Sequence, residues 1–220
     1  MSTPPLKAWS YSLLNDFETC PKKYYHLRIA KDSREPESEQ MMHGKMVHKA
    51  LEDHAAVGTA LPEHLLHLQP MMSKLLAVPG DRIIEGKVGL TRDFRPTTFF
   101  AKDVWFRGVV DFGVVGKTKA VLVDYKTGKV KDNHDQMSLF AAAGLSTYPR
   151  LTEIRTAYLW TQFGTITQQT FTDAAPIWQA FMPRVRRIEI AHETGKFPPK
   201  PSGLCRAWCP VMTCEHNGRR

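Results

Sequence analysis

Ala120-Val-Leu-Val-Asp-Tyr-Lys-Thr-Gly128 is the most informative stretch of the chain, because an apolar run is followed directly by an acid, Asp124, and a base, Lys126. The apolar residues predict a strand. Side chains alternate between the two faces of a strand, so Asp124 and Lys126 must point to the same side. A second apolar run, Phe106-Arg-Gly-Val-Val-Asp111, ends in another acid. If the two strands are neighbours, two carboxylates and one ammonium group meet at the same strand end.

This combination of side chains is typical of metal-assisted phosphodiester cleavage. Mg²⁺ and Mn²⁺ prefer oxygen ligands, usually one or two carboxylates with waters and substrate phosphate oxygens. Asp111 and Asp124 fit that role, and the ion would lower the pKa of a bound water. Lys126 would orient or deprotonate this water, or stabilise the transition state. The structural alternative is that these charges only form turns and surface pairs.

Composition sets the broad class of the protein. The 220 residues are 42% hydrophobic and 10% aromatic, which suits one folded domain with a sizeable core. A net charge of +8 favours a polyanionic partner, DNA or RNA. No apolar stretch is long enough to cross a membrane, and the first residues lack a signal-peptide apolar region. We therefore expect a cytoplasmic protein, or one in the host cytoplasm if it is phage-encoded, without a membrane partner.

The hydrophobic pattern predicts helices and strands around one sheet. A first helix capped by Ser10 or Ser12 is expected, and Pro21 marks either a break or the first turn of a new helix that contains Tyr24, Tyr25 and Leu27. The next three strands are expected to form an antiparallel meander. The order of elements therefore predicts a mixed α/β fold. The expected helices cover 40–57, 62–77, 134–145 and 173–193, and the expected strands cover 82–90, 104–115, 120–125, 153–161 and 165–171.

Five short motifs follow one another in a specific order. They are Gly44-Lys-Met-Val-His48, Glu85 on the first strand, Gly108-Val-Val-Asp111, Val123-Asp-Tyr-Lys-Thr-Gly128 and Gln136-Met-Ser-Leu-Phe140. This set resembles the RecB-like branch of the PD-(D/E)XK nuclease superfamily over 12–214. The resemblance implies a restriction-endonuclease-like core with a central mixed β-sheet flanked by helices. Phe140 stands where the family commonly has Tyr, which removes a hydroxyl and keeps the aromatic ring.

The resemblance also implies a role for each motif residue. The metal ligands would be His48, Asp111, Asp124 and the backbone carbonyl of Tyr125. The catalytic group would include Lys126 with the two aspartates, supported by Glu85. Gln136 would contact DNA or position Lys126.

Four cysteines form a second feature: Cys20, Cys205, Cys209 and Cys214. Three of them fall within ten residues, which suggests thiolate ligands for zinc or an iron–sulfur cluster. Free or buried cysteines are the structural alternative. The layout is similar to that of AddB-type nuclease domains and the nucleases of CRISPR adaptation modules. That similarity implies a 4Fe–4S cluster joining the N- and C-terminal segments, with Zn²⁺ as the alternative.

Two further residues are expected to contact nucleic acid. Lys129 lies in a basic stretch after the second acidic strand, and Tyr24 lies among basic residues near the N-terminus. Lysines would contact phosphates, and the tyrosine ring would stack on an unpaired base.

Together these patterns predict a Mg²⁺/Mn²⁺-dependent deoxyribonuclease with a single RecB-like nuclease domain. Its parts would be a helical region over 10–80, a core over 81–195 and a Cys-rich tail over 196–220. We expect an exonuclease that processes DNA ends in recombination, repair or phage DNA metabolism. The alternatives are an endonuclease with the same site, a non-catalytic nucleic-acid-binding or assembly subunit, or a zinc-stabilised interaction protein. The chain has no phosphate-binding loop of a helicase motor, so a helicase or recombination partner would supply any unwinding. A homo-oligomer is compatible with the sequence, which does not specify cleavage polarity or strand preference.

Overall fold

The computed structural model describes residues 3–130 and 133–219. The chain divides into two compact units. The central unit is Ser38–Gln179, and the terminal unit combines Met1–Glu37 with Ala180–Arg220. These boundaries differ from the expected subdivision at 80/81 and 195/196. All motif residues expected to act on phosphodiesters lie in the central unit, and all four cysteines lie in the terminal unit.

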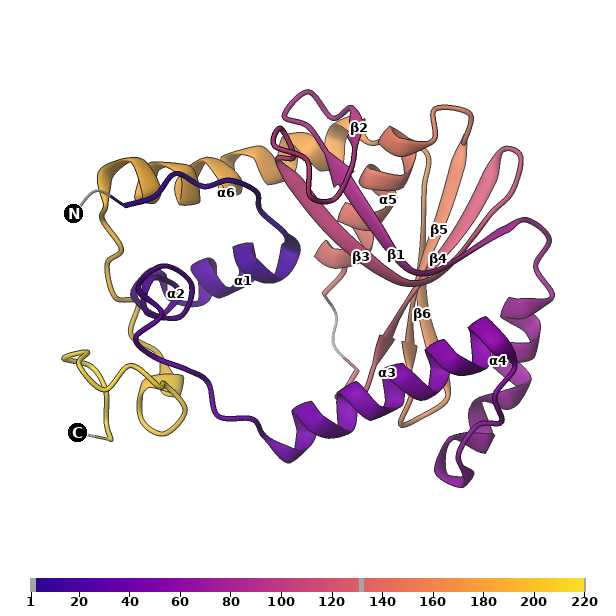
Figure 1. The fold of residues 1–220 in the computed structure, drawn as a ribbon, viewed down its shortest axis with the longest axis horizontal. Helices are drawn as coiled ribbons and strands as arrows, with labels where there is room; N and C mark the ends of the chain where they lie inside the picture. Colours follow the sequence, from indigo (N-terminus) through magenta and orange to yellow (C-terminus); the bar gives the residue numbers. More distant parts are fainter. Residues whose placement is uncertain (1–2, 131–132, 220) are drawn as a thin grey trace. The chain divides into compact units, whose positions relative to one another are not determined.

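The central unit is built on a six-stranded sheet with the strand order β2-β1-β3-β4-β5-β6 (Figure 1). Neighbouring strands are antiparallel except β4 and β5, which are parallel. The mixed sheet is therefore confirmed, and so is the antiparallel order of its first three long strands. The strands are β1 (Asp81–Leu90), β2 (Pro96–Thr97), β3 (Phe106–Val115), β4 (Lys119–Lys126), β5 (Glu153–Trp160) and β6 (Thr165–Phe171).

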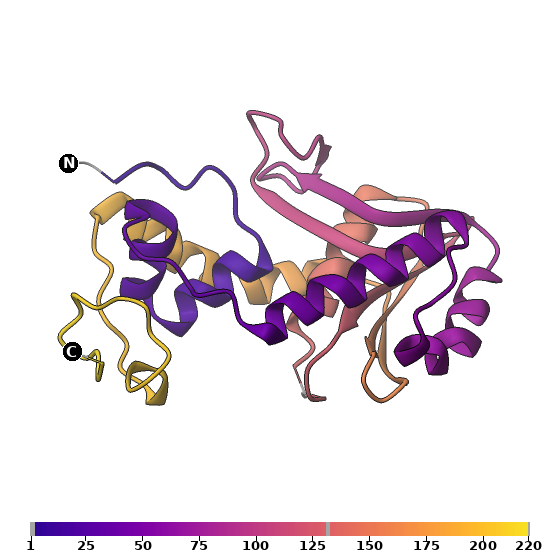
Figure 2. The same cartoon turned by 60° about the horizontal axis from the view of Figure 1, so that its bottom comes forward.

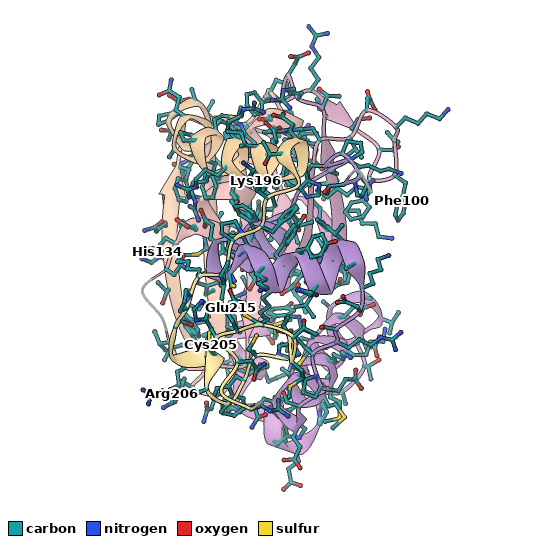
Figure 3. The ribbon with its side chains drawn as sticks, turned by 90° about the vertical axis from the view of Figure 1, so that its left-hand side faces the viewer. Phe100, His134, Lys196, Cys205, Arg206 and Glu215 are labelled. Atoms are coloured by element: carbon teal, nitrogen blue, oxygen red, sulfur yellow. The ribbon has the colours of Figure 1, made fainter. Side chains whose placement is uncertain are left out.

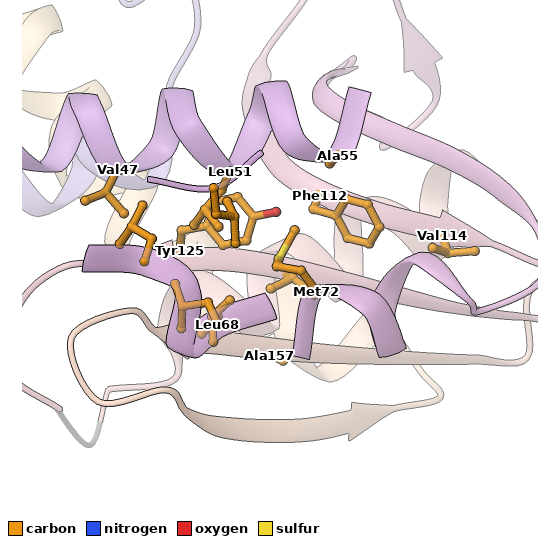
Figure 4. Close-up of a cluster of buried hydrophobic side chains, with 13 residues drawn as sticks. Val47, Leu51, Ala55, Leu68, Met72, Phe112, Val114, Tyr125 and Ala157 are labelled. Carbon is orange, nitrogen blue, oxygen red and sulfur yellow. The ribbon is translucent and has the colours of Figure 1, made fainter. Parts of the chain in front are cut away.

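One face of this sheet is covered by α3 (Glu39–Val57) and α4 (Gln69–Leu76), which follows a 3₁₀ turn, η2 (Glu63–Leu68). Helix α3 crosses β1 and β3 (Figures 1 and 2). Its N-terminus is capped by Ser38, whose side chain accepts a hydrogen bond from the Met41 amide, and it ends at left-handed Gly58. Figure 4 shows the core beneath these helices, where Leu51 and Tyr125 are buried between α3 and the strands.

The opposite face of the sheet is covered by α5 (Asp135–Thr147), which forms the crossover that the parallel β4–β5 pair requires. Its alanines 141–143 are buried, so the helix lies close to the strands. Gly144 allows the closest approach, because a Cβ atom there would lie 2.5 Å from Ile154 Cδ1. Small side chains therefore let this part of α5 lie close to the strands, and Phe140, Leu151 and Ile154 fill the rest of the core on that face.

The terminal unit is helical. Ser10 caps α1 (Tyr11–Thr19), which is followed by α2 (Pro21–Tyr24) and the π-helical turn η1 (Tyr25–Ala30). The long helix α6 (Ala175–Thr194) enters this unit at Ala180, and a short 3₁₀ turn, η3 (Gly203–Cys205), lies in the tail. Glu18 accepts hydrogen bonds from Arg184 and Arg187, so those two arginines are engaged within the unit.

Element boundaries follow the sequence pattern to within a few residues, because periodicity and caps are local signals. The short strand β2, the parallel β4–β5 pair and the π-helical turn were not anticipated. Pro96 in β2 has no amide hydrogen to donate, which agrees with its place at the sheet edge. Within the described residues, no helix combines the length and apolar character needed to cross a membrane.

Candidate active site

The candidate site lies where the sheet splits between β3 and β4. Their regular pairing runs from Val115↔Ala120 to Phe112↔Val123 and stops there. Beyond that point β3 stays paired with β1, and β4 stays paired with β5 (Figure 1). Asp111 and Asp124 occupy the next position on each strand. Two carboxylates that would otherwise face each other across a ladder therefore flank the opening.

Asp111 bridges the split with its own side chain. Its Oδ2 accepts a hydrogen bond of 2.7 Å from the Tyr125 amide, which replaces a backbone acceptor that the separated strand no longer supplies. The Tyr125 side chain points into the core beneath α3 (Figure 4). The same residue thus anchors β4 with its ring and orients Asp111 with its backbone.

Asp124, Lys126 and Gln136 form a closed set of contacts. Lys126 Nζ lies 2.6 Å from Asp124 Oδ2, as the alternation of β4 predicts. It also donates a hydrogen bond of 2.8 Å to Gln136 Oε1, and Gln136 Nε2 donates one of 2.7 Å to Asp124 Oδ1. Gln136 lies in the first turn of α5, so this helix holds both charged groups in place.

His48 approaches the carboxylates from α3. Its Nδ1 lies 3.5 Å from Asp111 Oδ2, and its ring lies edge-on to Tyr125 with 5.7 Å between centroids. Burial lowers the pKa of His48, but the carboxylates of Asp111 and Asp124 outweigh this and raise it overall. The Gly44–His48 motif therefore brings its histidine to the predicted acids.

Glu85 lies at a strained point in β1. Its φ of 49° is in the left-handed region, which is costly for a residue with a Cβ. The regular pairs on either side are Ile84↔Phe112 and Gly86↔Val110, which leaves Glu85 beside Asp111 without a regular pair. The pKa of Glu85 is raised by burial, and then by the charges of Asp111 and Glu52.

The strand faces change at this same point. Ile84 and Phe112 pack in the core under α3, whereas Val110 and Val88 pack with the core under α5. A strand that alternated without interruption would keep Val110 and Phe112 on one face. This break in the alternation of β3 explains why Asp111 belongs to neither apolar cluster and lies at the opening instead.

Excess negative charge is the main electrostatic feature of the opening. Burial raises the pKa of Asp124. The positive charge of Lys126 lowers this pKa and the negative charge of Asp111 raises it, so that the pKa of Asp124 is about 6. Asp124 Oδ2 is a buried oxygen without a directed hydrogen bond, although the Lys126 ammonium is close. Asp111 and Asp124 are both removed from water, and two neighbouring buried carboxylates favour either protonation of one of them or the binding of a cation.

The donor set suits a hard divalent cation. Within residues 3–130 and 133–219, no three side chains of His, Cys, Asp or Glu gather into a group that could hold a metal ion. Mg²⁺ does not require such a group, because it commonly uses one or two carboxylates together with waters and substrate phosphates. Asp111 and Asp124 supply two carboxylates, and Asp124 Oδ2 accepts no directed hydrogen bond, with the Lys126 ammonium 2.6 Å away.

Two residues expected to bind nucleic acid differ in their surroundings. Lys129 is exposed on the loop after β4 and remains a candidate for phosphate contact. Tyr24 belongs to the terminal unit, is only 2% exposed and is hydrogen-bonded through its hydroxyl to His192 Nε2. Its ring packs edge-on against Phe17, so the expectation that it stacks on a base does not fit this structure. The amphipathic character of tyrosine, which suggested stacking, is satisfied here by the core.

The four cysteines are all free. Cys20 Sγ accepts a hydrogen bond from the Lys200 amide, and Cys205 Sγ accepts one from the Ser202 amide. No metal-holding group of three or more sulfur, imidazole or carboxylate side chains is found among the described residues. The described residues therefore give no support to a four-thiolate cluster, and the expectation of iron–sulfur or zinc binding rests on the sequence layout alone.

Hydrogen bonds from Thr161 also hold the backbone of Lys126, and the sequence pattern did not predict them. The Thr161 amide and hydroxyl both donate to the Lys126 carbonyl, at 2.8 and 3.2 Å. The Thr161 carbonyl in turn contacts His67 Nε2 at 2.8 Å. The partners are separated by 35 and 94 positions in the chain, so no short-range sequence signal reveals them.

Comparisons with known proteins concern the fold and the family of this chain. A protein named "Putative exonuclease" from Eubacterium rectale has a similar structure, with a TM-score of 0.51 and 14% identity, over 90% of this chain and 86% of that one. The crystal structure of SSO0001 matches with a TM-score of 0.43 and 12% identity, over 96% of this chain and 87% of that one. Identity this low shows similarity of fold alone, and no curated protein matches the sequence. The family model of the PD-(D/E)XK nuclease superfamily matches residues 8–214, and the chain therefore belongs to that superfamily.

Proposed function

We propose that the protein is a Mg²⁺- or Mn²⁺-dependent deoxyribonuclease that acts as an exonuclease on DNA ends. The observation that carries the proposal is the opening between β3 and β4, where Asp111, Asp124 and Lys126 meet. A role limited to binding would not require two buried carboxylates beside a lysine held by Gln136. Superfamily membership and the similar fold of the Eubacterium rectale protein support a nuclease activity.

In this proposal each side chain has a definite task. Asp111 and Asp124 would hold the metal ion, which supplies charge neutralisation at the phosphate and a water of lowered pKa. His48 and the Tyr125 amide orient Asp111, and the His48 ring and the Tyr125 carbonyl would serve as additional ligands. Lys126 holds its ammonium toward the opening and stabilises the negative charge that develops on the phosphate. Glu85, on β1, would add a further negative charge beside Asp111.

The proposal is tested by incubating end-labelled linear DNA, single- and double-stranded, with Mg²⁺ or Mn²⁺. Closed circular DNA of the same sequence distinguishes an exonuclease from an endonuclease, because it has no ends. Lys126→Ala and Asp124→Asn should abolish cleavage. Lys119→Ala is the matched control, since Lys119 lies at the other end of β4 and pairs with Glu153 at 3.0 Å. Intact DNA with folded, metal-supplied wild type would refute the nuclease assignment.

A thiolate-bound cofactor in the terminal unit is a separate proposal. Its support is the sequence layout of one cysteine before the nuclease motifs and three after them. Iron and zinc per chain should be measured after anaerobic purification, in the wild type and in Cys209→Ala. Metal content equal in the two proteins would remove this proposal without affecting the nuclease site.

A further inference from the structure

The loop from Thr91 to Trp105, which connects β1 to β3 and carries β2, has two kinds of aromatic residue. Phe94 is directed inward, where it stacks on Trp178 at 4.6 Å between ring centroids and packs edge-on against Trp105. Phe100 is 74% exposed and lies on the outer side of the loop (Figure 3). Much of this loop is exposed, and Phe100 places a large apolar ring in water there, beside the ring of Phe99.

Two cations lie over the exposed ring of Phe100 and the partly buried ring of Phe99. Lys87 Nζ is 5.9 and 5.6 Å from the ring centroids of Phe99 and Phe100. The Arg107 guanidinium carbon is 5.3 and 5.7 Å from the same two centroids. We call these four residues, Lys87, Phe99, Phe100 and Arg107, the aromatic–basic patch.

The cations of this patch lack acidic partners. Within residues 3–130 and 133–219, neither Lys87 nor Arg107 forms an ion pair with a carboxylate. Arg107 Nε is, in addition, a buried nitrogen without a hydrogen-bond partner in this part of the chain. A guanidinium group is normally satisfied by carboxylate, phosphate or backbone oxygens. The patch thus combines two unneutralised positive charges with an aromatic surface in water.

The strand register relates this patch to the candidate active site. Lys87 pairs with Val109 and Gly89 pairs with Arg107, so both cations project from the same face of the β1–β3 pair. That face is opposite the one on which Gly108 meets Phe140 of α5. Arg107 and Asp111 are four residues apart on β3, which corresponds to about 13 Å along the strand. At about 3.4 Å per nucleotide, this distance equals roughly four stacked nucleotides.

We propose that the aromatic–basic patch binds an unpaired base of the substrate strand, a few nucleotides from the phosphate that would be cleaved beside Asp111, Asp124 and Lys126. Phe100 stacks on the base, while Lys87 and Arg107 contact the flanking phosphates. Duplex DNA hides the faces of its bases, so this contact selects single-stranded DNA or a frayed end. The inference deepens the proposed nuclease function, on which it rests, by specifying the strandedness of its substrate.

The test is direct binding, measured without divalent metal so that no cleavage occurs. Fluorescence anisotropy compares a labelled 20-nucleotide strand, a blunt 20-base-pair duplex and a 20-residue abasic strand. Phe100→Ala should weaken binding of the normal strand by about 5- to 150-fold, equivalent to about 1–3 kcal/mol. Binding of the duplex and the abasic strand should change by less than about twofold, because neither offers a free base.

Control variants separate stacking from general effects on the surface. Phe100→Trp should restore binding, because it restores an aromatic surface. Phe163→Ala is the matched control: it also removes an exposed ring (50% exposed), but one on the β5–β6 turn and outside the patch, so binding should not change. Arg107→Gln should reduce the slope of log K against log salt by about 0.7 for each phosphate that the side chain neutralises. Unchanged single-strand binding by Phe100→Ala, or an equal weakening on all three ligands, would overturn the proposal. Because binding does not require cleavage, an inactive wild type would leave this result interpretable.

Discussion

Gln136 offers the sharpest test of how the site is organised, because it contacts Asp124 and Lys126 at once. The informative change is Gln136→Ala, which removes both hydrogen bonds and keeps the helix, since alanine is a strong helix former. The two bonds involve charged partners, and each contributes on the order of 1.5–3 kcal/mol to holding its partner in place. The protein should remain folded, because Gln136 lies at the start of α5 and outside the apolar core, although loss of the donor to the buried Asp124 should lower its thermal stability.

Cleavage should respond more strongly than stability. Lys126 would keep its ion pair with Asp124 but lose its second anchor, so its ammonium would sample other positions. Misplacement of a catalytic group by about 1 Å costs up to about 100-fold in rate. We therefore expect kcat to fall by about 10- to 100-fold, with KM changed by less than about threefold.

The assay is steady-state cleavage of end-labelled DNA at saturating metal, with Gln168→Ala on β6 as the control for removal of a glutamine. Gln136→Glu should be at least as damaging as alanine, because it keeps the lysine contact and places a further carboxylate beside Asp124. A large increase in KM with kcat unchanged would refute the reasoning. That outcome would show that Gln136 contacts DNA and does not position Lys126.

Three further predictions concern strain, packing and charge. Glu85→Gly should keep or raise Tm while reducing cleavage, since glycine tolerates the φ of 49°; a drop in Tm would contradict the strain argument. Gly144→Ala should lower stability by about 1–3 kcal/mol, measured by urea unfolding, because its Cβ would overlap Ile154; an unchanged midpoint would show that the strand yields freely. Burial raises the pKa of Glu18, but the hydrogen bonds from Arg184 outweigh this and lower it. Glu18→Gln should therefore cost about 1–2 kcal/mol at neutral pH, discounted for its 22% exposed side chain, and the difference from wild type should vanish as pH falls below 4.5; a difference independent of pH would exclude the ion pair as its cause.

Local sequence signals were sufficient to predict most helices and strands of the central unit. Apolar runs and caps placed β1, β3, β4 and α3 close to their observed bounds, because strand and helix periodicity depend on neighbouring residues. The alternation of β4 also placed Asp124 and Lys126 on one face, where they form an ion pair. The mixed α/β class followed from the order of these elements.

Other features depend on residues that are distant in the chain. Tyr24 is surrounded by basic residues in the sequence, yet its ring is buried and bonded to a histidine 168 positions away. The parallel β4–β5 pair requires the crossover through α5, which no strand pattern specifies. The Thr161 contacts to Lys126 likewise arise only when β5 lies beside β4.

Motif spacing and strand alternation are properties of the local chain, so they are enough to predict which side chains are available for chemistry and on which strand ends they lie. How these side chains meet depends on the tertiary structure. Three features of the site depend on how the strands and helices pack in the central unit. They are the split between β3 and β4, the positive φ of Glu85 and the contacts of Gln136 with both Asp124 and Lys126. The aromatic–basic patch has the same origin, since its four residues come from two strands and the loop between them. Such contacts depend on three-dimensional register, which a pattern of neighbouring residues does not encode.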